Sequence, residues 1–190
     1  MNLARALAAC AVAALLSGCA VFAPGAAAPA AAPFDILGRV LASNDGRAFA
    51  SGFRWRHDAE GDEIWLMSPV GQTLAHILAD AGGATLTSAD QQEYRAQSVE
   101  NLTRRALGWP LPLSRLQYWI NGDAAPGVLI ATVVRDAQGR LSTLEQDGWS
   151  IRYAYPEALT GSSRPRRLDM AQGGQLIRMI VDDRRPGDAP

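Results

Sequence analysis

The stretch Ile36–Trp55, ILGRVLASNDGRAFASGFRW, decides the fold class of this 190-residue chain. Its second half alternates apolar with basic or small residues, which is the period of a half-buried β-strand. One face of that strand holds Phe49, Phe53 and Trp55, and the other holds Arg54 and Arg56. Asn44-Asp45-Gly46 separates it from the apolar run Ile36–Ala42. A turn of this composition between two strands predicts a tight antiparallel hairpin.

The same pattern recurs along the chain, with turns rich in glycine or proline between the apolar runs. Further strands are expected at Ile64–Met67, Leu74–Ala79, Ala84–Thr87, Trp149–Tyr155, Arg167–Ala171 and Ile177–Val181. An antiparallel meander of about ten strands does not stay flat. We therefore predict a mainly β (α+β) fold, a curled antiparallel open half barrel of about ten or eleven strands, with short helices as a lid over an apolar cavity.

Two short helices are expected to interrupt the sheet. Ser98 can cap a helix that ends at Gly108, and Ser114 can cap a second helix that stops at Asn121-Gly122. Val128–Val134 then resumes the sheet with apolar residues on both faces, as in a strand that helices cover on one side. The concave face could hold a long apolar ligand, or the helices could fill it completely. The sequence leaves both possibilities open.

The N-terminal residues predict export and lipidation. Arg5 precedes the apolar run Ala6–Leu16, which is shorter than the roughly twenty residues of a membrane span. Small residues in Leu16-Ser17-Gly18-Cys19 then predict a lipoprotein signal peptide over residues 1–18 and a lipid on Cys19. The alternative is an ordinary secretory cleavage beside an incidental cysteine. We expect residues 19–33 to form an Ala/Pro tether, residues 34–183 to form the domain and residues 184–190 to form a polar tail.

No enzyme chemistry is predicted. His57 and His76 lack neighbours at metal-ligand spacing, and Gly161-Ser162-Ser163 offers a nucleophile no adjacent base. No catalytic residue, metal or cofactor is therefore expected, apart from the covalent lipid on Cys19. The net charge of −1 argues against a nucleic-acid partner.

Three segments of the chain carry a family resemblance. The first is Phe53-Arg54-Trp55 followed by Leu66-Met67-Ser68-Pro69-Val70-Gly71-Gln72-Thr73. The second is Leu107-Gly108-Trp109-Pro110-Leu111-Pro112-Leu113 with Leu116, Trp119, Ile120 and Gly122. The third is Gln146-Asp147-Gly148-Trp149-Ser150-Ile151-Arg152-Tyr153. Taken together in this order, the three segments resemble the LolB family of outer-membrane lipoprotein receptors.

This resemblance implies a protein that accepts acylated lipoproteins from the periplasmic carrier LolA and inserts them into the outer membrane. It implies a lipid-anchored monomer that faces the periplasm. The expected cavity residues are Phe53, Trp55, Leu66, Leu74, Leu116, Trp119, Ile151 and Tyr153. Pro69, Val70 and Gly71 would form an insertion loop, although Val70 could instead fold back onto the sheet. The alternative function is an accessory or structural envelope lipoprotein that binds a partner or a lipid without transferring cargo.

Overall fold

The computed structural model describes residues 30–157 and 163–186. The predicted signal peptide, Cys19 and most of the tether lie outside the described residues, as do Gly161 and Ser162. Among the residues that are described, no helix is long and apolar enough to cross a membrane.

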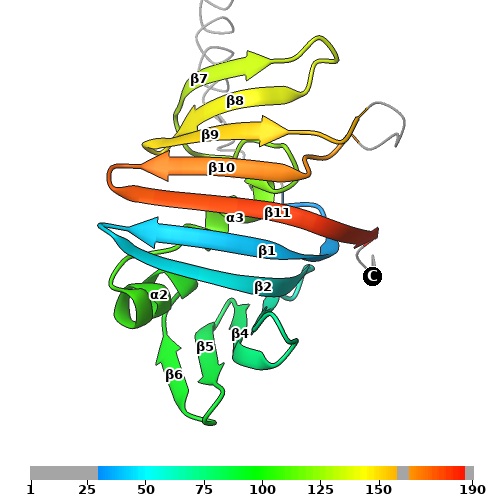
Figure 1. Ribbon diagram of the computed structural model, residues 1–190. Coiled ribbons are helices and arrows are strands. Elements are labelled where there is room, and N and C mark those ends of the chain that lie inside the picture. The colour runs from blue at the N-terminus through cyan, green and yellow to red at the C-terminus, as the bar shows by residue number, and fades with distance from the viewer. Residues whose placement is uncertain (1–29, 158–162, 187–190) are drawn as a thin grey trace, which may run out of the picture.

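Eleven strands form one antiparallel sheet in the order β6-β5-β4-β3-β2-β1-β11-β10-β9-β8-β7 (Figure 1). The strands are β1 (Phe34–Asn44), β2 (Arg47–His57), β3 (Asp62–Met67), β4 (Thr73–Asp80), β5 (Gly83–Ser88), β6 (Glu93–Ala96), β7 (Ile130–Arg135), β8 (Leu141–Gln146), β9 (Trp149–Ala154), β10 (Arg167–Gln172) and β11 (Gln175–Pro186). The end strands β6 and β7 do not pair with each other, so the sheet stays open. The predicted mainly β half barrel is confirmed.

The β1–β2 hairpin forms as the sequence predicts. Asn44 pairs with Arg47, and the two turn residues between them, Asp45 and Gly46, have φ angles of 48° and 82°. Left-handed conformations at both central positions define the turn that matches the twist of a hairpin. This turn sets the register in which Trp55 lies opposite Ile36.

The first and last strands of the domain meet in the middle of the sheet, where β1 pairs with β11 along its whole length. A bulge interrupts this pairing between Leu37 and Gly38. A Cβ at Gly38 would lie 2.1 Å from the carbonyl oxygen of Ile180 and 2.8 Å from the ring of Phe53. Only glycine fits at a contact this close, so Gly38 allows the bulge that bends the centre of the sheet.

Strand β11 continues past the predicted domain boundary at residue 183. Arg184 pairs with Ile36, and Phe34 pairs with Pro186. The Arg184 side chain in this extension is half-buried and donates hydrogen bonds to Asn121 Oδ1 and to the Ile120 carbonyl oxygen. Residues 184–186 are therefore part of the sheet, although their composition resembles a polar tail.

Two helices connect β6 to β7, namely α2 (Val99–Leu107) and α3 (Leu113–Trp119). The predicted cap of α2 is confirmed, because the Ser98 side chain accepts a hydrogen bond from Asn101 N and Gly108 ends the helix at φ 87°. The predicted cap of α3 is wrong. This helix begins at Leu113, and the backbone N–H of Ser114 donates to Glu100 Oε1 at 3.0 Å. A carboxylate from α2 thus takes the place of a local cap.

Strand β7 also differs from the prediction. Its residues are apolar on both faces, which suggested a covered strand, yet all six are exposed. It lies at the edge of the sheet, where it pairs only with β8, and neither of its faces is covered. Local composition carries no information about edge position.

Candidate functional site: the concave face and its helix

The concave face of the sheet is a continuous apolar surface. Cross-strand pairing places Ile36, Trp55, Ile64 and Ile77 side by side on β1 to β4. On the other half of the sheet, Leu144, Ile151, Met170 and Ile177 form a similar row across β8 to β11. All eight side chains are buried in one cluster. The alternating strands therefore direct their apolar side chains to one side, as their period predicts.

The structure gathers most of the predicted cavity residues in this cluster. Phe53, Trp55, Leu116, Trp119, Ile151 and Tyr153 are buried in it, and Leu66 packs against it partly buried. Leu74 does not join them. A register shift between Leu66 and Met67 places Ala75 opposite Leu66 and leaves Leu74 39% exposed.

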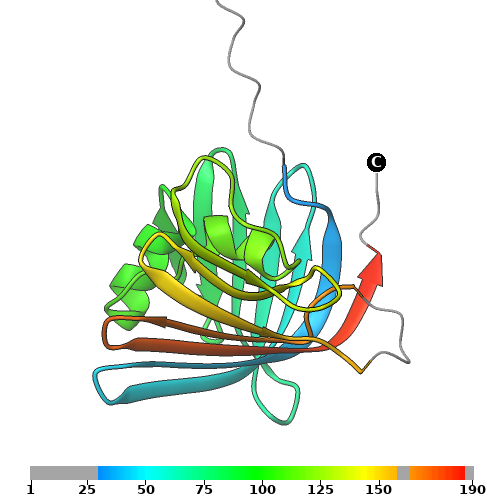
Figure 2. The same cartoon turned by 90° about the horizontal axis from the view of Figure 1, so that it is seen from above.

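Helix α3 lies inside the curve of the sheet (Figure 2), and its apolar side chains pack against the concave face. Trp119 and the following Ile120 are completely buried, and Leu113 and Leu116 nearly so. The indole of Trp119 lies 6.3 Å from that of Trp149 on β9. Of the two possibilities that the sequence left open, the structure shows the filled concave face. A ligand that occupies the surface beneath α3 must therefore displace this helix.

Gln146 on β8 holds the C-terminal end of α3 in place. Its Oε1 accepts hydrogen bonds from Trp119 Nε1 and from Ala125 N, both at 2.9 Å. Its Nε2 donates to the carbonyl oxygens of Ala125 and Val128 at 2.8 and 3.2 Å. The side chain is 1% exposed, so these bonds satisfy a deeply buried amide. The family resemblance drew attention to the segment that starts at Gln146, but not to this role.

Charged side chains hold both ends of α3. Arg184 donates from Nη2 to the carbonyl oxygen of Ile120 and from Nη1 to Asn121 Oδ1, each at 2.9 Å. Burial lowers the pKa of Arg184 to about 10, so it stays cationic at neutral pH beside the negative end of the helix. At the N-terminal end, burial disfavours the charge of Glu100, but hydrogen bonds from Ser114 and the backbone outweigh it and lower its pKa. Glu100 is therefore a carboxylate when it caps α3.

Tyr153 is the one predicted cavity residue with an unsatisfied polar atom in the described part of the chain. Its hydroxyl is buried without a hydrogen-bond partner among the described residues, and burial raises its pKa. The neighbouring Tyr155 differs, because its hydroxyl donates to the carbonyl oxygen of Leu141 at 2.9 Å. The two tyrosines form a natural pair for comparison.

We expect Tyr153→Phe to raise the free energy of unfolding by up to about 1 kcal/mol, because it removes a buried hydroxyl that has no partner. Tyr155→Phe should lower the same quantity by about 1 kcal/mol, because it leaves the Leu141 carbonyl without its donor. Urea unfolding followed by tryptophan fluorescence measures both. A marked loss of stability in Tyr153→Phe would show that its hydroxyl has a partner after all.

The loop between β3 and β4 presents the predicted insertion residues. Gly71 N donates to the Ser68 carbonyl oxygen at 2.9 Å, and Gly71 has φ 83°. This is a turn with Pro69 in its second position and Val70 at its tip. Val70 is 81% exposed, so it does not fold back onto the sheet. Figure 2 shows the loop, in teal, on the opposite side of β1 and β2 from α3.

The fold and site define an open antiparallel half barrel whose apolar interior is closed by a helix. The same fold occurs in a crystal structure of a LolA superfamily protein from Nitrosomonas europaea, with a TM-score of 0.51 and 14% sequence identity over 86% of this chain and 90% of that one.

Comparison of sequences assigns the chain to a particular family within this fold. A family described as outer membrane lipoprotein LolB matches residues 32–183. The outer-membrane lipoprotein LolB of Chromobacterium violaceum is 43% identical over 88% of this chain and 91% of its own length, and that of Azoarcus sp. is 37% identical over 92% and 91%. The chain belongs to the LolB family. It is thus an outer-membrane lipoprotein of a family of non-enzymatic receptors, which receive lipoproteins from LolA and insert them into the outer membrane.

Proposed function

We propose that the acyl chains of an incoming lipoprotein bind on the concave face after α3 has moved out of it. One observation carries the proposal: α3, which packs inside the apolar concave face of the sheet, is a helix of only seven residues. A helix this short is not stable on its own in water, so its packing against the sheet maintains it. Acyl chains offer the sheet the same kind of contact that α3 now provides.

The polar contacts of α3 are suited to reversible closure. Glu100, Gln146 and Arg184 hold the helix through hydrogen bonds rather than through a covalent link. Opening exposes apolar surface and breaks these bonds, and burial of acyl chains offsets this cost at about 0.8 kcal/mol per methylene. The net affinity for cargo is then lower than the acyl chains alone would give. An intermediate affinity of this kind allows a receptor to take cargo from a carrier and release it to a bilayer.

We infer further that Cys19 carries the lipid anchor and that residues 19–33 tether the domain to the membrane. Fifteen residues reach at most about 50 Å when fully extended, so the domain stays close to the bilayer surface. A single sheet supplies the whole concave face, so a monomer suffices for the proposed activity.

Tryptophan quenching tests the proposed binding site. Trp55 and Trp149 lie on the concave face and Trp119 lies on α3 against it, whereas Trp65 lies on the other face of the sheet, stacked on His76. We would use the mature chain with Cys19→Ser and Trp65→Phe and mix it with LolA loaded with a lipoprotein that carries brominated acyl chains. Bromine quenches nearby indoles, so cargo acceptance should quench the fluorescence of the receptor. Cargo with unbrominated chains is the control.

Each other outcome has a distinct meaning. Transfer of cargo, measured by co-elution, without quenching would show that the acyl chains bind elsewhere on the receptor. Cargo that stays on LolA would favour the accessory lipoprotein that binds a partner without transfer.

A further inference from the structure

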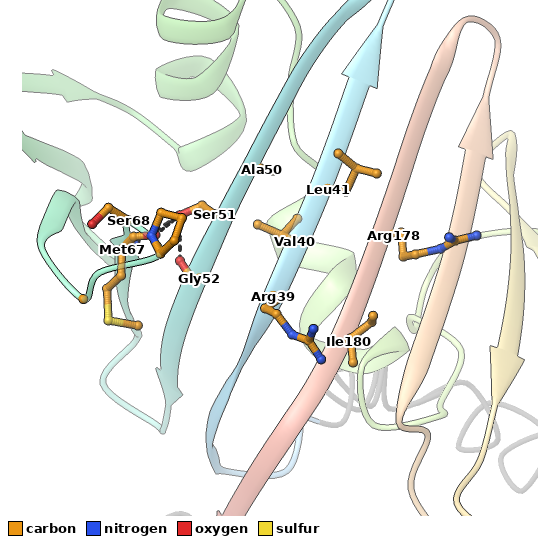
Figure 3. Close-up of a pocket in the computed structure, with 12 residues that line it drawn as sticks. Arg39, Val40, Leu41, Ala50, Ser51, Gly52, Met67, Ser68, Arg178 and Ile180 are labelled. Atoms are coloured by element: carbon orange, nitrogen blue, oxygen red, sulfur yellow. Dashed lines mark hydrogen bonds between the residues drawn. The ribbon is translucent and has the colours of Figure 1, made fainter.

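A second apolar surface lies outside the concave face. A groove of about 660 Å³ runs between the β3–β4 loop and strands β2, β1 and β11 (Figure 3). Its apolar lining comes from Val40, Leu41, Ala50, Met67, Pro69 and Ile180. Leu41 and Ile180 belong to the outer face, because they alternate along their strands with the buried Ala42 and Met179. The groove therefore opens on the outer face, and of its apolar lining Val40 also packs against the concave-face cluster.

The sheet leaves this groove open for a structural reason. Strand β3 pairs with β2 only from Gly52 to His57, so the first half of β2 has no partner on that side. The loop that follows β3 lies beside this unpaired half, where Ser51 Oγ donates to the Met67 carbonyl oxygen at 2.9 Å. Gly52 adds no side chain to the space, and Leu41 remains 47% exposed on the floor. Concave apolar surfaces of this kind mark binding sites.

Two arginines border the groove, and each forms an ion pair with an aspartate. Figure 3 shows Arg39 and Arg178 on the adjacent strands β1 and β11. Asp182 accepts hydrogen bonds from Nε and Nη2 of Arg39, and Asp169 accepts one from Nε of Arg178. A guanidinium has five N–H donors, so each arginine keeps donors for a further acceptor. Arginine is well suited to phosphate because its planar fork can bind two oxygens at once.

We propose that this groove binds one acyl chain of a bilayer phospholipid, whose anionic headgroup contacts Arg39 and Arg178. The apolar floor can take an acyl chain, and the N–H donors that Arg39 and Arg178 keep free can bind the oxygens of a phosphate headgroup. The groove is also continuous with the loop that carries Val70, since Pro69 and Gly71 line it. A phospholipid held there would dock the outer face of the sheet on the membrane. The concave face would remain free for cargo, so this inference goes beyond the proposed function.

Vesicle binding tests the proposal with the mature chain that carries Cys19→Ser, which keeps every described residue. The probes are vesicles of phosphatidylethanolamine and phosphatidylglycerol in which some phosphatidylglycerol has a photoreactive diazirine in one acyl chain. Flotation measures the partition of the protein onto vesicles, and mass spectrometry locates the photolabel. We expect label on the groove residues and weaker partition onto neutral phosphatidylcholine vesicles.

Two variants alter the groove and one serves as a matched control. Leu41→Asp should lower the partition onto anionic vesicles about tenfold, because it puts a carboxylate in the apolar floor. Gly52→Ile should reduce labelling of the groove by filling it. A Cβ there meets its neighbours at an ordinary 3.6 Å, and urea unfolding checks that the larger side chain leaves the fold intact. Leu129→Asp makes the same charge change at a leucine that is 87% exposed and far from the groove in sequence, and it should leave partition unchanged.

Several results would overturn the proposal. Equal losses in Leu41→Asp and Leu129→Asp would indicate a diffuse effect of surface charge. Label confined to concave residues would show that the bilayer lipid enters the cargo site. The groove could be labelled in the Cys19→Ser chain but not in the lipidated protein. This result would show that the protein's own acyl chains occupy the groove. Cargo acceptance from LolA in solution should be normal in Gly52→Ile, which separates failure of this inference from failure of the proposed function.

Discussion

Val70→Glu should accept lipoproteins from LolA normally and fail to insert them into a membrane. Val70 stands at the tip of a turn that Pro69 and Gly71 shape, and its side chain is 81% exposed. An exposed valine favours entry into the apolar part of a bilayer, whereas a carboxylate opposes it by about 3 kcal/mol. We therefore expect the rate of cargo transfer from receptor to vesicles to fall about 100-fold. Labelled cargo in floated vesicles measures this rate.

Val70→Leu is the control, because it keeps an apolar side chain at the tip and should insert cargo at the rate of the unchanged protein. The substitution lies in an exposed loop, so both variants should unfold at the same urea concentration as the parent. A folded Val70→Glu protein that takes cargo from LolA and still inserts it at full rate would exclude the insertion role of this residue.

Gln146→Leu should lower the free energy of unfolding by roughly 3–5 kcal/mol, since it leaves several buried polar groups without partners. Those groups are Trp119 Nε1, Ala125 N and the carbonyl oxygens of Ala125 and Val128. Leucine is close to glutamine in size, so packing changes little. Urea unfolding of the mature Cys19→Ser chain measures the loss.

Gln172→Leu is the matched control, because that amide is only partly buried and donates one bond, to the Asp147 carbonyl oxygen. It should cost less than about 1 kcal/mol. If Gln146 holds α3 closed, the folded Gln146→Leu protein should also accept cargo faster than the parent. Slower acceptance despite normal folding would contradict the role of α3 as a removable cover.

The elements that the sequence predicts well are those governed by local rules. The Asn-Asp-Gly turn and the period-two runs predict the β1–β2 hairpin and the side of the sheet on which Phe53 and Trp55 lie, and both are confirmed. The Ser98 cap and Gly108 likewise define α2. Each of these features depends on residues within a few positions of one another.

The remaining features depend on distant contacts. Trp119 meets Gln146 across 27 positions, and Ile120 meets Arg184 across 64, so no local pattern indicates them. Ser114 is a residue type that often caps helices, but here Glu100 of α2 caps α3 by accepting a hydrogen bond from Ser114 N. Leu74 fits the alternation of a strand, yet a register shift beside it changes which residue faces inward. Strand β6 has only four residues, too few to show a period.

The pairing of β1 with β11 has a consequence for the order in which the chain can fold. An exported polypeptide crosses the inner membrane with its N-terminal end first, so β1 arrives early and waits for the strand that emerges last. Closing a loop that spans almost the whole domain is entropically costly and slow. Until β11 arrives, β1 presents an unpaired edge in a crowded compartment. The periplasm must protect this edge during every round of secretion, before the mature receptor can begin to protect the lipids of other proteins.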